Sequence, residues 1–223
     1  MSTQTSATVV LAYHSIHAVE PGIDAPDVIA SPQALERDVR TLLDAGYRFL
    51  TADDLVTETG GGQPAGRTAL VTFDDGWLDG LTVAAPMLSR LGVRATFFLC
   101  PGLWGNHDPR MGEAGHVLTA EDARGLAAAG MDLGAHSMTH PDLRTLGDAE
   151  LQRELADSRA AVEALTGRPC RSLAYPFGLH DARVQRAVAD GGFDLAFTYE
   201  PGPWRPFAAP RIPAPLSDQY AAA

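Results

Sequence analysis

Two kinds of apolar pattern alternate along most of the chain. Short segments rich in apolar and β-branched residues are typical of buried strands, and the longer segments between them carry apolar residues at helical spacing. This alternation predicts parallel β/α units. We expect strands at 8–13, 69–73, 95–99, 131–135, 172–174 and 193–198, and helices at 32–45, 78–91, 119–129, 148–165 and 182–189.

Capping residues support several helix boundaries. Ser31 and Thr119 stand where an N-cap is needed. Glycines that accept left-handed backbone geometry follow three of the helices: Gly92, Gly130 and Gly167. The length of 223 residues, 45% of them hydrophobic, suits one substantial core, so we expect a single domain over 1–223. The proline-rich segment 201–215 is expected to be an irregular tail that wraps back over that domain.

Acidic residues outnumber basic ones, 28 against 17, which gives a formal net charge of -11. This charge disfavours nucleic acid and anionic membrane as partners, and an uncharged substrate fits it better. No apolar run is long enough to span a bilayer, and residues 8–13 are too short for a signal peptide. We therefore expect a cytoplasmic chain, although a trimmed export signal would leave no trace. Cys100 and Cys170 form no C-x-x-C pair and are expected to be buried thiols.

Polar residues follow four of the expected strands. They are His14, the pair Asp74 and Asp75, His136, and residues 175–178. Because the carboxyl ends of parallel strands open onto one face of a barrel, we expect these residues to converge there.

The adjacent carboxylates of Asp74 and Asp75 follow Phe73 and precede Gly76, which lets the chain turn close to a bound group. One carboxylate can bind a metal ion while the other acts as a base. Paired aspartates are also common in solvated turns, and the pair at 53–54 is interpreted as a helix start.

His136 and His140 are separated by three residues directly after an apolar strand. This spacing lets one helical turn direct both imidazoles at one ion. An isolated pair could equally include a structural loop histidine. Together with an aspartate from another strand end, the pair predicts a two-histidine, one-carboxylate metal site with open positions.

Three motifs resemble a known family. Residues 72–76 (Thr-Phe-Asp-Asp-Gly), 136–140 (His-Ser-Met-Thr-His) and 175–178 (Tyr-Pro-Phe-Gly) are similar to the first three motifs of the polysaccharide deacetylases, carbohydrate esterase family four. Residues 95–98 resemble a strand between the first two motifs, and order and spacing agree over 11–213. The resemblance implies an α/β fold, a single distorted (β/α)7 barrel with the active site at the C-terminal ends of its parallel strands.

The resemblance also implies a role for each motif residue. Asp74 would be the general base, and Asp75, His136 and His140 would hold a divalent metal, zinc first and cobalt, nickel or iron as alternatives. In that chemistry a metal-bound water is the nucleophile. A backbone N–H near Phe177 would help to hold the oxyanion.

Aromatic residues complete the expected substrate site. Tyr175 and Phe177 belong to the third motif, and Trp204 lies in a loop where its ring could stack on a sugar. Trp77 is more typical of a core or lid position.

The sequence departs from the family pattern at two places. Many members carry an arginine where this chain has Ala174. Arg211 is our preferred replacement, because a nearby cation would keep Asp74 ionised, and Arg171 is the alternative. The family's usual acid histidine is also missing, since no histidine follows Phe193. We expect His14 to be the general acid, as in a subgroup acting on poly-N-acetylglucosamine, although it could instead be a structural strand-end histidine. The other histidines, His17, His107, His116 and His180, are expected to be exposed to solvent.

The resemblance implies a hydrolase that removes N-acetyl groups from an N-acetylated aminosugar, in a glycan, a glycolipid or a small glycoside. Two alternatives stay open. Relatives with the same barrel hydrolyse cyclic amides such as allantoin or imides, and a domain without the fifth motif could be a non-catalytic carbohydrate-binding module. The oligomeric state is not indicated by the sequence.

Overall fold

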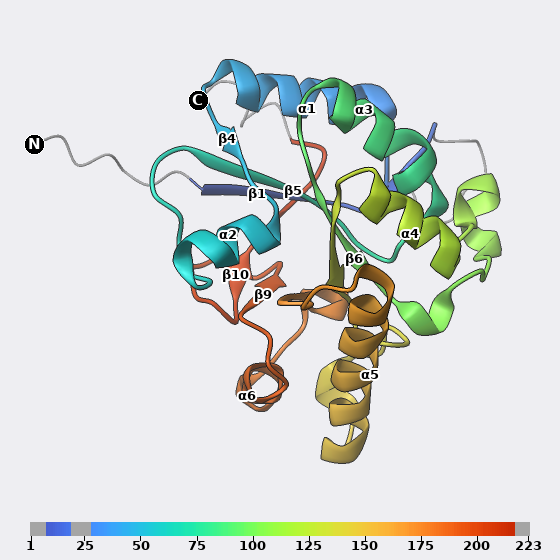
Figure 1. Ribbon diagram of the computed structural model, residues 1–223, viewed down its shortest axis with the longest axis vertical. Helices are drawn as coiled ribbons and strands as arrows, with labels where there is room; N and C mark the ends of the chain where they lie inside the picture. Colours follow the sequence, from blue (N-terminus) through green and yellow to red (C-terminus); the bar gives the residue numbers. More distant parts are fainter. Residues whose placement is uncertain (1–7, 19–27, 217–223) are drawn as a thin grey trace, which may run out of the picture.

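The computed structural model describes residues 8–18 and 28–216, and its centre is a parallel sheet curled into a barrel (Figure 1). The predicted α/β barrel is confirmed. The expected domain limits at residues 1 and 223 lie outside the described residues. The strands of the sheet are β1 (Thr8–Tyr13), β4 (Arg48–Phe49), β5 (Thr68–Phe73), β6 (Thr96–Leu99), β7 (Asp132–Ala135), β8 (Ser172–Ala174), β9 (Leu195–Thr198), β10 (Ala209–Pro210) and β11 (Ile212–Pro213).

The strand order is β10-β9-β8-β7-β6-β5-β1-β11, with β4 beside the start of β5, and the paired strands are parallel. A separate small sheet joins β2 (Ser15–Ile16) to β3 (Ile29–Ala30). The six long strands expected from the sequence are all present, and their ends move by no more than two residues.

A short terminal segment, residues 209–213, nearly closes the barrel. Its first half, β10, pairs with β9, and its second half, β11, pairs with β1, with Arg211 between them. If this segment counts as one position, the described part of the chain has seven positions around the ring. The prediction of an irregular tail over 201–215 is therefore wrong for residues 209–213, which form β10 and β11. Proline is tolerated here because the neighbouring residues donate the ladder bonds: the Arg211 N–H to Thr198 O and the Ala214 N–H to Ala12 O.

Helices surround the barrel (Figure 1). Because they follow the strands in chain order, each parallel strand returns to the same end of the sheet. Among the described helices, none is long and apolar enough to cross a membrane. They are α1 (Pro32–Asp44), α2 (Ala52–Thr59), α3 (Ala85–Arg90), α4 (Ala120–Ala128), α5 (Asp148–Thr166) and α6 (Ala182–Asp190), with short helical turns η2 (Gly80–Ala84), η3 (Pro101–Leu103), η4 (Pro109–Gly115), η5 (Leu143–Thr145) and η6 (Pro176–Gly178).

Two helices differ from the expectation. The helix expected at 78–91 is present as one continuous helical segment over 78–90, but its middle, η2, is π-helical before α3 begins. Pro86 lies at the start of α3, and because proline has no N–H to donate, it removes one backbone hydrogen bond at the junction with η2. Only the start of α2 was indicated by the sequence. Thr51 and Asp54 form a reciprocal capping box there, which confirms the helix-start interpretation of residues 53–54.

Alternate residues of each strand face opposite sides of the sheet, and this sets the direction of the polar side chains at the strand ends. Leu11 and Val71 belong to a core cluster that includes residues of the surrounding helices. Leu70 and Phe98 belong to a second cluster with residues of α2. The second cluster therefore fills the barrel interior. Asp74 continues the inward-facing series of β5, so its carboxylate points into the barrel mouth.

The opposite end of the barrel holds a buried carboxylate. Asp132 begins β7 and is 7% exposed. Its Oδ2 accepts hydrogen bonds from the Thr96 hydroxyl at 2.9 Å and from the Asp53 N–H at the start of α2 at 3.2 Å. Burial raises the pKa of Asp132 to about 6, although those two hydrogen bonds lower it. Above that pH the Asp132 carboxylate is charged and buried in the folded protein, whereas unfolding would expose it to water.

We predict that Asp132→Asn stabilises the protein at neutral pH. The asparagine oxygen can accept both hydrogen bonds, and no charge is buried. The folded-state pKa of Asp132 lies above its unfolded value, so the wild type loses stability as the pH rises from about 4 to about 6. Urea unfolding at pH 7.5 should show a gain of about 1–3 kcal/mol that shrinks towards zero near pH 4. The exposed Asp157→Asn is the control, and an equal gain at both pH values would contradict the prediction.

Candidate metal centre and catalytic cleft

A cleft of about 480 Å³ opens at the carboxyl ends of the strands. A larger groove of about 700 Å³ lies between α5 and α6, but it contains none of the expected catalytic residues. The predicted convergence at the strand ends is confirmed for these lining residues: His14, Asp74, Asp75, His136, His140 and Phe177.

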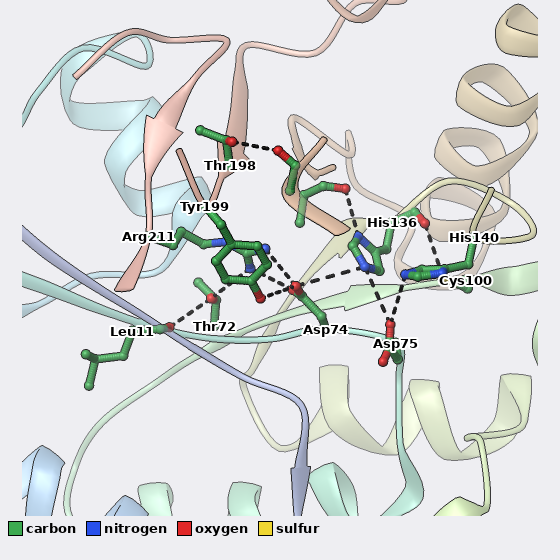
Figure 2. A network of polar contacts seen from close by, with 12 residues as sticks. Leu11, Thr72, Asp74, Asp75, Cys100, His136, His140, Thr198, Tyr199 and Arg211 are labelled. Atoms are coloured by element: carbon green, nitrogen blue, oxygen red, sulfur yellow. Dashed lines mark hydrogen bonds and ion pairs between the residues drawn. The ribbon is translucent and has the colours of Figure 1, made fainter. Parts of the chain in front are cut away.

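Three of the lining residues present donor atoms to one point (Figure 2). The Asp75 Oδ1 lies 3.5 Å from His136 Nε2 and 3.4 Å from His140 Nε2, and all three donor atoms lie within 4.8 Å of one another. Bonds of about 2.0–2.1 Å meeting at a tetrahedral ion would place donor atoms about 3.4 Å apart. Both distances from Asp75 Oδ1 therefore fit the ligands of a zinc-sized divalent ion.

Neighbouring groups orient two of these donors. His136 Nδ1 lies 2.8 Å from Ala174 O, which favours the tautomer that leaves Nε2 without a proton and directed at Asp75. The Trp77 indole N–H donates to Asp75 Oδ2 at 3.1 Å, so Oδ1 remains for the two histidines. Trp77 therefore holds a ligand in place, which the sequence analysis did not foresee.

Backbone geometry at the site is unusual. Within the described residues, four non-glycine residues have positive φ, and all lie in or beside the motifs: Asp75 (70°), Ser137 (62°), His140 (61°) and Phe177 (59°). Such geometry costs of order 1–3 kcal/mol per residue and persists where the surroundings enforce it. The expected helical turn between His136 and His140 is wrong, because positive φ at Ser137 breaks any right-handed turn. A loop directs the two rings instead, and the His140 N–H donates to Ser137 Oγ.

Glu154 of α5 fixes that loop from outside the cleft. Its Oε2 accepts the Met138 N–H at 2.8 Å and the Thr139 N–H at 2.9 Å. Its Oε1 accepts the Thr139 hydroxyl at 2.6 Å. Three hydrogen bonds to one carboxylate thus hold the two residues that lie between Ser137 and His140.

Asp74 is buried and forms a two-pronged ion pair with Arg211 (Figure 2). Arg211 Nη1 donates to Oδ1 at 2.7 Å and Nη2 to Oδ2 at 2.6 Å. Burial alone would raise the pKa of Asp74, but the charge and the hydrogen bonds of Arg211 outweigh it and hold the pKa well below its usual range. The predicted contact of Arg211 with Asp74 is confirmed. Arg171, the alternative, pairs with Asp194 instead.

Tyr199 is a site residue that sequence reasoning missed. It follows the end of β9, the same signal that identified the other strand-end residues. Its hydroxyl donates to Asp74 Oδ2 at 3.1 Å, and its ring lies 4.7 Å from the Arg211 guanidinium carbon. The ring of His14 faces it at 6.5 Å between centroids. His14 thus lies at the cleft on the side of Arg211.

The remaining expected residues divide between the cleft and the core. Phe177 is 57% exposed and its ring meets His140 edge-on at 4.5 Å. Tyr175 is fully buried and its hydroxyl donates to Phe207 O, so its side chain does not line the cleft. Trp204 also lies away from the cleft, because it packs on Phe197 and donates to Gly61 O. We correct both substrate-contact predictions, since the fold uses these rings for packing.

Two further expectations can be checked. Both cysteines are free and buried, as predicted. His180 is not solvent-exposed as expected, because its side chain is 7% exposed beside Glu200 and Gln185.

Comparisons with known proteins, by sequence and by structure, agree on one family. The family model described as polysaccharide deacetylase matches residues 61–196, more than half of the chain. The structure of deacetylase PplD from Streptococcus pyogenes, in complex with acetate, is 25% identical, covers 93% of this chain and 92% of that one, and superposes with a TM-score of 0.80.

Two curated relatives are longer than this chain. YxkH of Bacillus subtilis (strain 168), named for the same family, is 27% identical over 86% of the chain and 64% of its own length. The chitooligosaccharide deacetylase of Sinorhizobium fredii (strain NBRC 101917 / NGR234) is 26% identical over 67% of the chain and 64% of its own length. The chain thus spans less than two thirds of either relative.

We predict that Glu154→Ala loosens the metal site without removing a ligand. The loop between the histidines would lose all three hydrogen bonds, and comparable losses behind metal ligands weaken metal binding by about 10–100-fold. Metal loss to a chelator and hydrogen exchange of the Met138 and Thr139 amides measure the effect. Glu154→Gln, which can keep most of these bonds, should lie between wild type and alanine. Asp157→Ala on the same helix is the control, and wild-type metal retention in Glu154→Ala would rule out the role.

Proposed function

Because the chain belongs to the polysaccharide deacetylase family, we propose that it is a metal-dependent hydrolase that removes N-acetyl groups from an N-acetylated aminosugar. One observation carries this proposal. Three candidate metal donors and an arginine-paired buried carboxylate lie side by side in one open cleft, with His136 Nε2 3.9 Å from Asp74 Oδ2. Base and metal site are therefore close enough to act on the same water molecule.

The relatives support the choice of substrate. PplD was solved with acetate, the acid that deacetylation releases, and the Sinorhizobium fredii relative is named for chitooligosaccharides. Chitooligosaccharides are built of N-acetylated aminosugars, and deacetylation of such a sugar would release acetate. The net charge of -11 also suits an uncharged substrate.

The metal would be held by Asp75, His136 and His140, with zinc first and cobalt, nickel or iron as alternatives. When bound, such an ion would polarise the amide carbonyl and lower the pKa of water in the cleft. The chain's own residues supply the proton transfers. Asp74 is held ionised by Arg211 and can accept the proton of the attacking water. His14, on the Arg211 side of the cleft, can give a proton to the departing nitrogen.

The same geometry bears on the two alternatives. A binding module has no need of a buried base held by an ion pair, so the retained pair of Asp74 and Arg211 favours catalysis. Hydrolysis of a cyclic amide would use the same groups. Allantoin and an imide therefore belong in the activity assay as comparison substrates.

We predict that activity depends on both the metal and Asp74. Chelation should abolish acetate release from N-acetylglucosamine oligomers, and added zinc should restore it. Asp74→Asn should lower turnover by about 100-fold or more, the usual contribution of a general base. His140→Ala should lose metal and activity together.

Metal content separates these effects. Asp74→Asn should still bind metal, because Asp74 is not among the three donors. Circular dichroism checks its folding, since the change leaves Arg211 with a weaker partner. Undiminished turnover of Asp74→Asn at saturating metal would contradict its role as base.

His14 gives a further prediction, because amides and esters differ in their leaving groups. An amine leaves poorly unless it is protonated, whereas the phenoxide of an activated acetate ester leaves without a proton. His14→Ala should keep its metal and lose most amide cleavage, with much less effect on the ester. Equal losses on both substrates would make His14 a structural residue.

A further inference from the structure

The cleft has two chemically different sides. His14 and Tyr199 follow β1 and β9, which residues 209–213 join, so both lie on the Arg211 side. The other side is formed by Trp77, by the loop between β6 and α4, and by Val28 just before β3. We call its lining the apolar wall, defined by five side chains: Val28, Trp77, Leu103, Met111 and Val117.

The apolar wall is a built structure rather than a chance exposure. Trp77, Met111 and Val117 form a small core cluster with Ile29, separate from the two main clusters, and Val28 and Leu103 pack against it. Backbone hydrogen bonds of 2.8 Å anchor the loop between β6 and α4 at both ends. The Gly102 N–H donates to Met138 O in the second motif, and the Leu118 N–H donates to Gly76 O in the first.

The positions of acid and base decide which part of an amide meets this wall. In the proposed reaction the departing nitrogen must reach His14, so the sugar lies on the His14 and Tyr199 side. The acyl carbon lies at the metal site, and its substituent points away from the nitrogen. That direction leads to the apolar wall, because Trp77 contacts Asp75, the metal ligand.

The apolar wall is larger than an acetyl group requires. Met111 and Val117 are almost fully buried and support the surface that Val28, Leu103 and Trp77 present. A single methyl group covers only part of that surface, and each further methylene buried against it contributes about 0.8 kcal/mol. The whole cleft of about 480 Å³ falls in the range that accepts drug-sized ligands. The polar side chains of this side, Asp108 and Arg110, are already paired with each other.

We propose that this cleft accepts N-acyl groups longer than acetyl, such as butanoyl and hexanoyl, with the acyl chain lying along the apolar wall. The inference rests on the proposed function and extends it to N-acylated aminosugars. In the reaction, the oxygen of one water bonds to the acyl carbon and the carbon–nitrogen bond breaks. One proton of that water and the amide proton remain on the amine, and the acid leaves as its carboxylate after losing the other.

The test compares one aminosugar carrying acetyl, butanoyl or hexanoyl on its nitrogen. We expect kcat/KM of the metal-loaded protein to rise about two- to four-fold per added methylene, the factor that such burial supplies. A steady fall from acetyl to hexanoyl would overturn the inference while leaving deacetylation intact. Absence of cleavage of all three amides would overturn both the proposed function and the inference.

Binding and a wall variant give independent readouts. Hexanoate should bind the metal-loaded Asp74→Asn protein more tightly than acetate does, and equal affinities would count against the apolar wall. Leu103→Trp fills the wall, so the ratio of hexanoyl to acetyl kcat/KM should fall at least about ten-fold. Leu43→Trp, at an exposed leucine on α1, is the matched control and should leave that ratio unchanged.

Discussion

The buried ion pair between Arg211 and Asp74 connects the last part of the barrel to its catalytic end. Arg211 lies between β10 and β11, the two short strands that pair with opposite edges of the sheet. Two charges in a nearly water-free position are stable only as a pair, and loss of one partner typically costs about 3–5 kcal/mol. The pair therefore ties barrel closure to the ionised state of Asp74, the proposed base. Tyr199 strengthens the arrangement, because it contacts both members.

The metal donors depend on a different kind of support. The site loops contain the four non-glycine residues with positive φ, a backbone conformation of raised energy. Contacts with other parts of the protein are therefore needed to keep these loops in place. Groups from other elements hold them: the Ala174 carbonyl behind His136, the Trp77 indole beside Asp75, and the Glu154 carboxylate under the loop that carries His140. A site held in this way before the ion binds loses less freedom on binding.

The two sides of the cleft follow from the order of strands around the ring. Arg211 and the Tyr199 hydroxyl come from the part of the chain that links β9 to β1, whereas the apolar wall comes from the connections after β5 and β6 together with Val28. A scissile amide has the same polarity, with a nitrogen that needs a proton on one side and an apolar acyl group on the other. In the proposed reaction, this arrangement sets the direction in which the substrate lies.

The sequence by itself determined the periodic elements and the candidate metal donors. Strand β1 and strand β8 occur at the expected residues, because each is a short apolar run between turn signals. Asp74, Asp75, His136 and His140 were identifiable because each follows such a strand, and parallel strands bring their carboxyl ends together. The arginine partner of Asp74 was inferred from the need to keep a buried carboxylate charged.

The tertiary structure alone decided the contacts that have no local pattern. From the sequence, Trp204 and Tyr175 were expected to contact the substrate. In the structure Trp204 packs against Phe197, and the Tyr175 hydroxyl donates to Phe207 O, so neither side chain lines the cleft. Glu154 is one of several acidic residues on α5, and only its distance from Thr139 shows that it holds the metal loop. Residues 209–213 form strands despite their prolines, because β9 and β1 lie on either side and pair with them. These outcomes depend on partners far away along the chain, whereas hydrophobic periodicity and capping report only on neighbours.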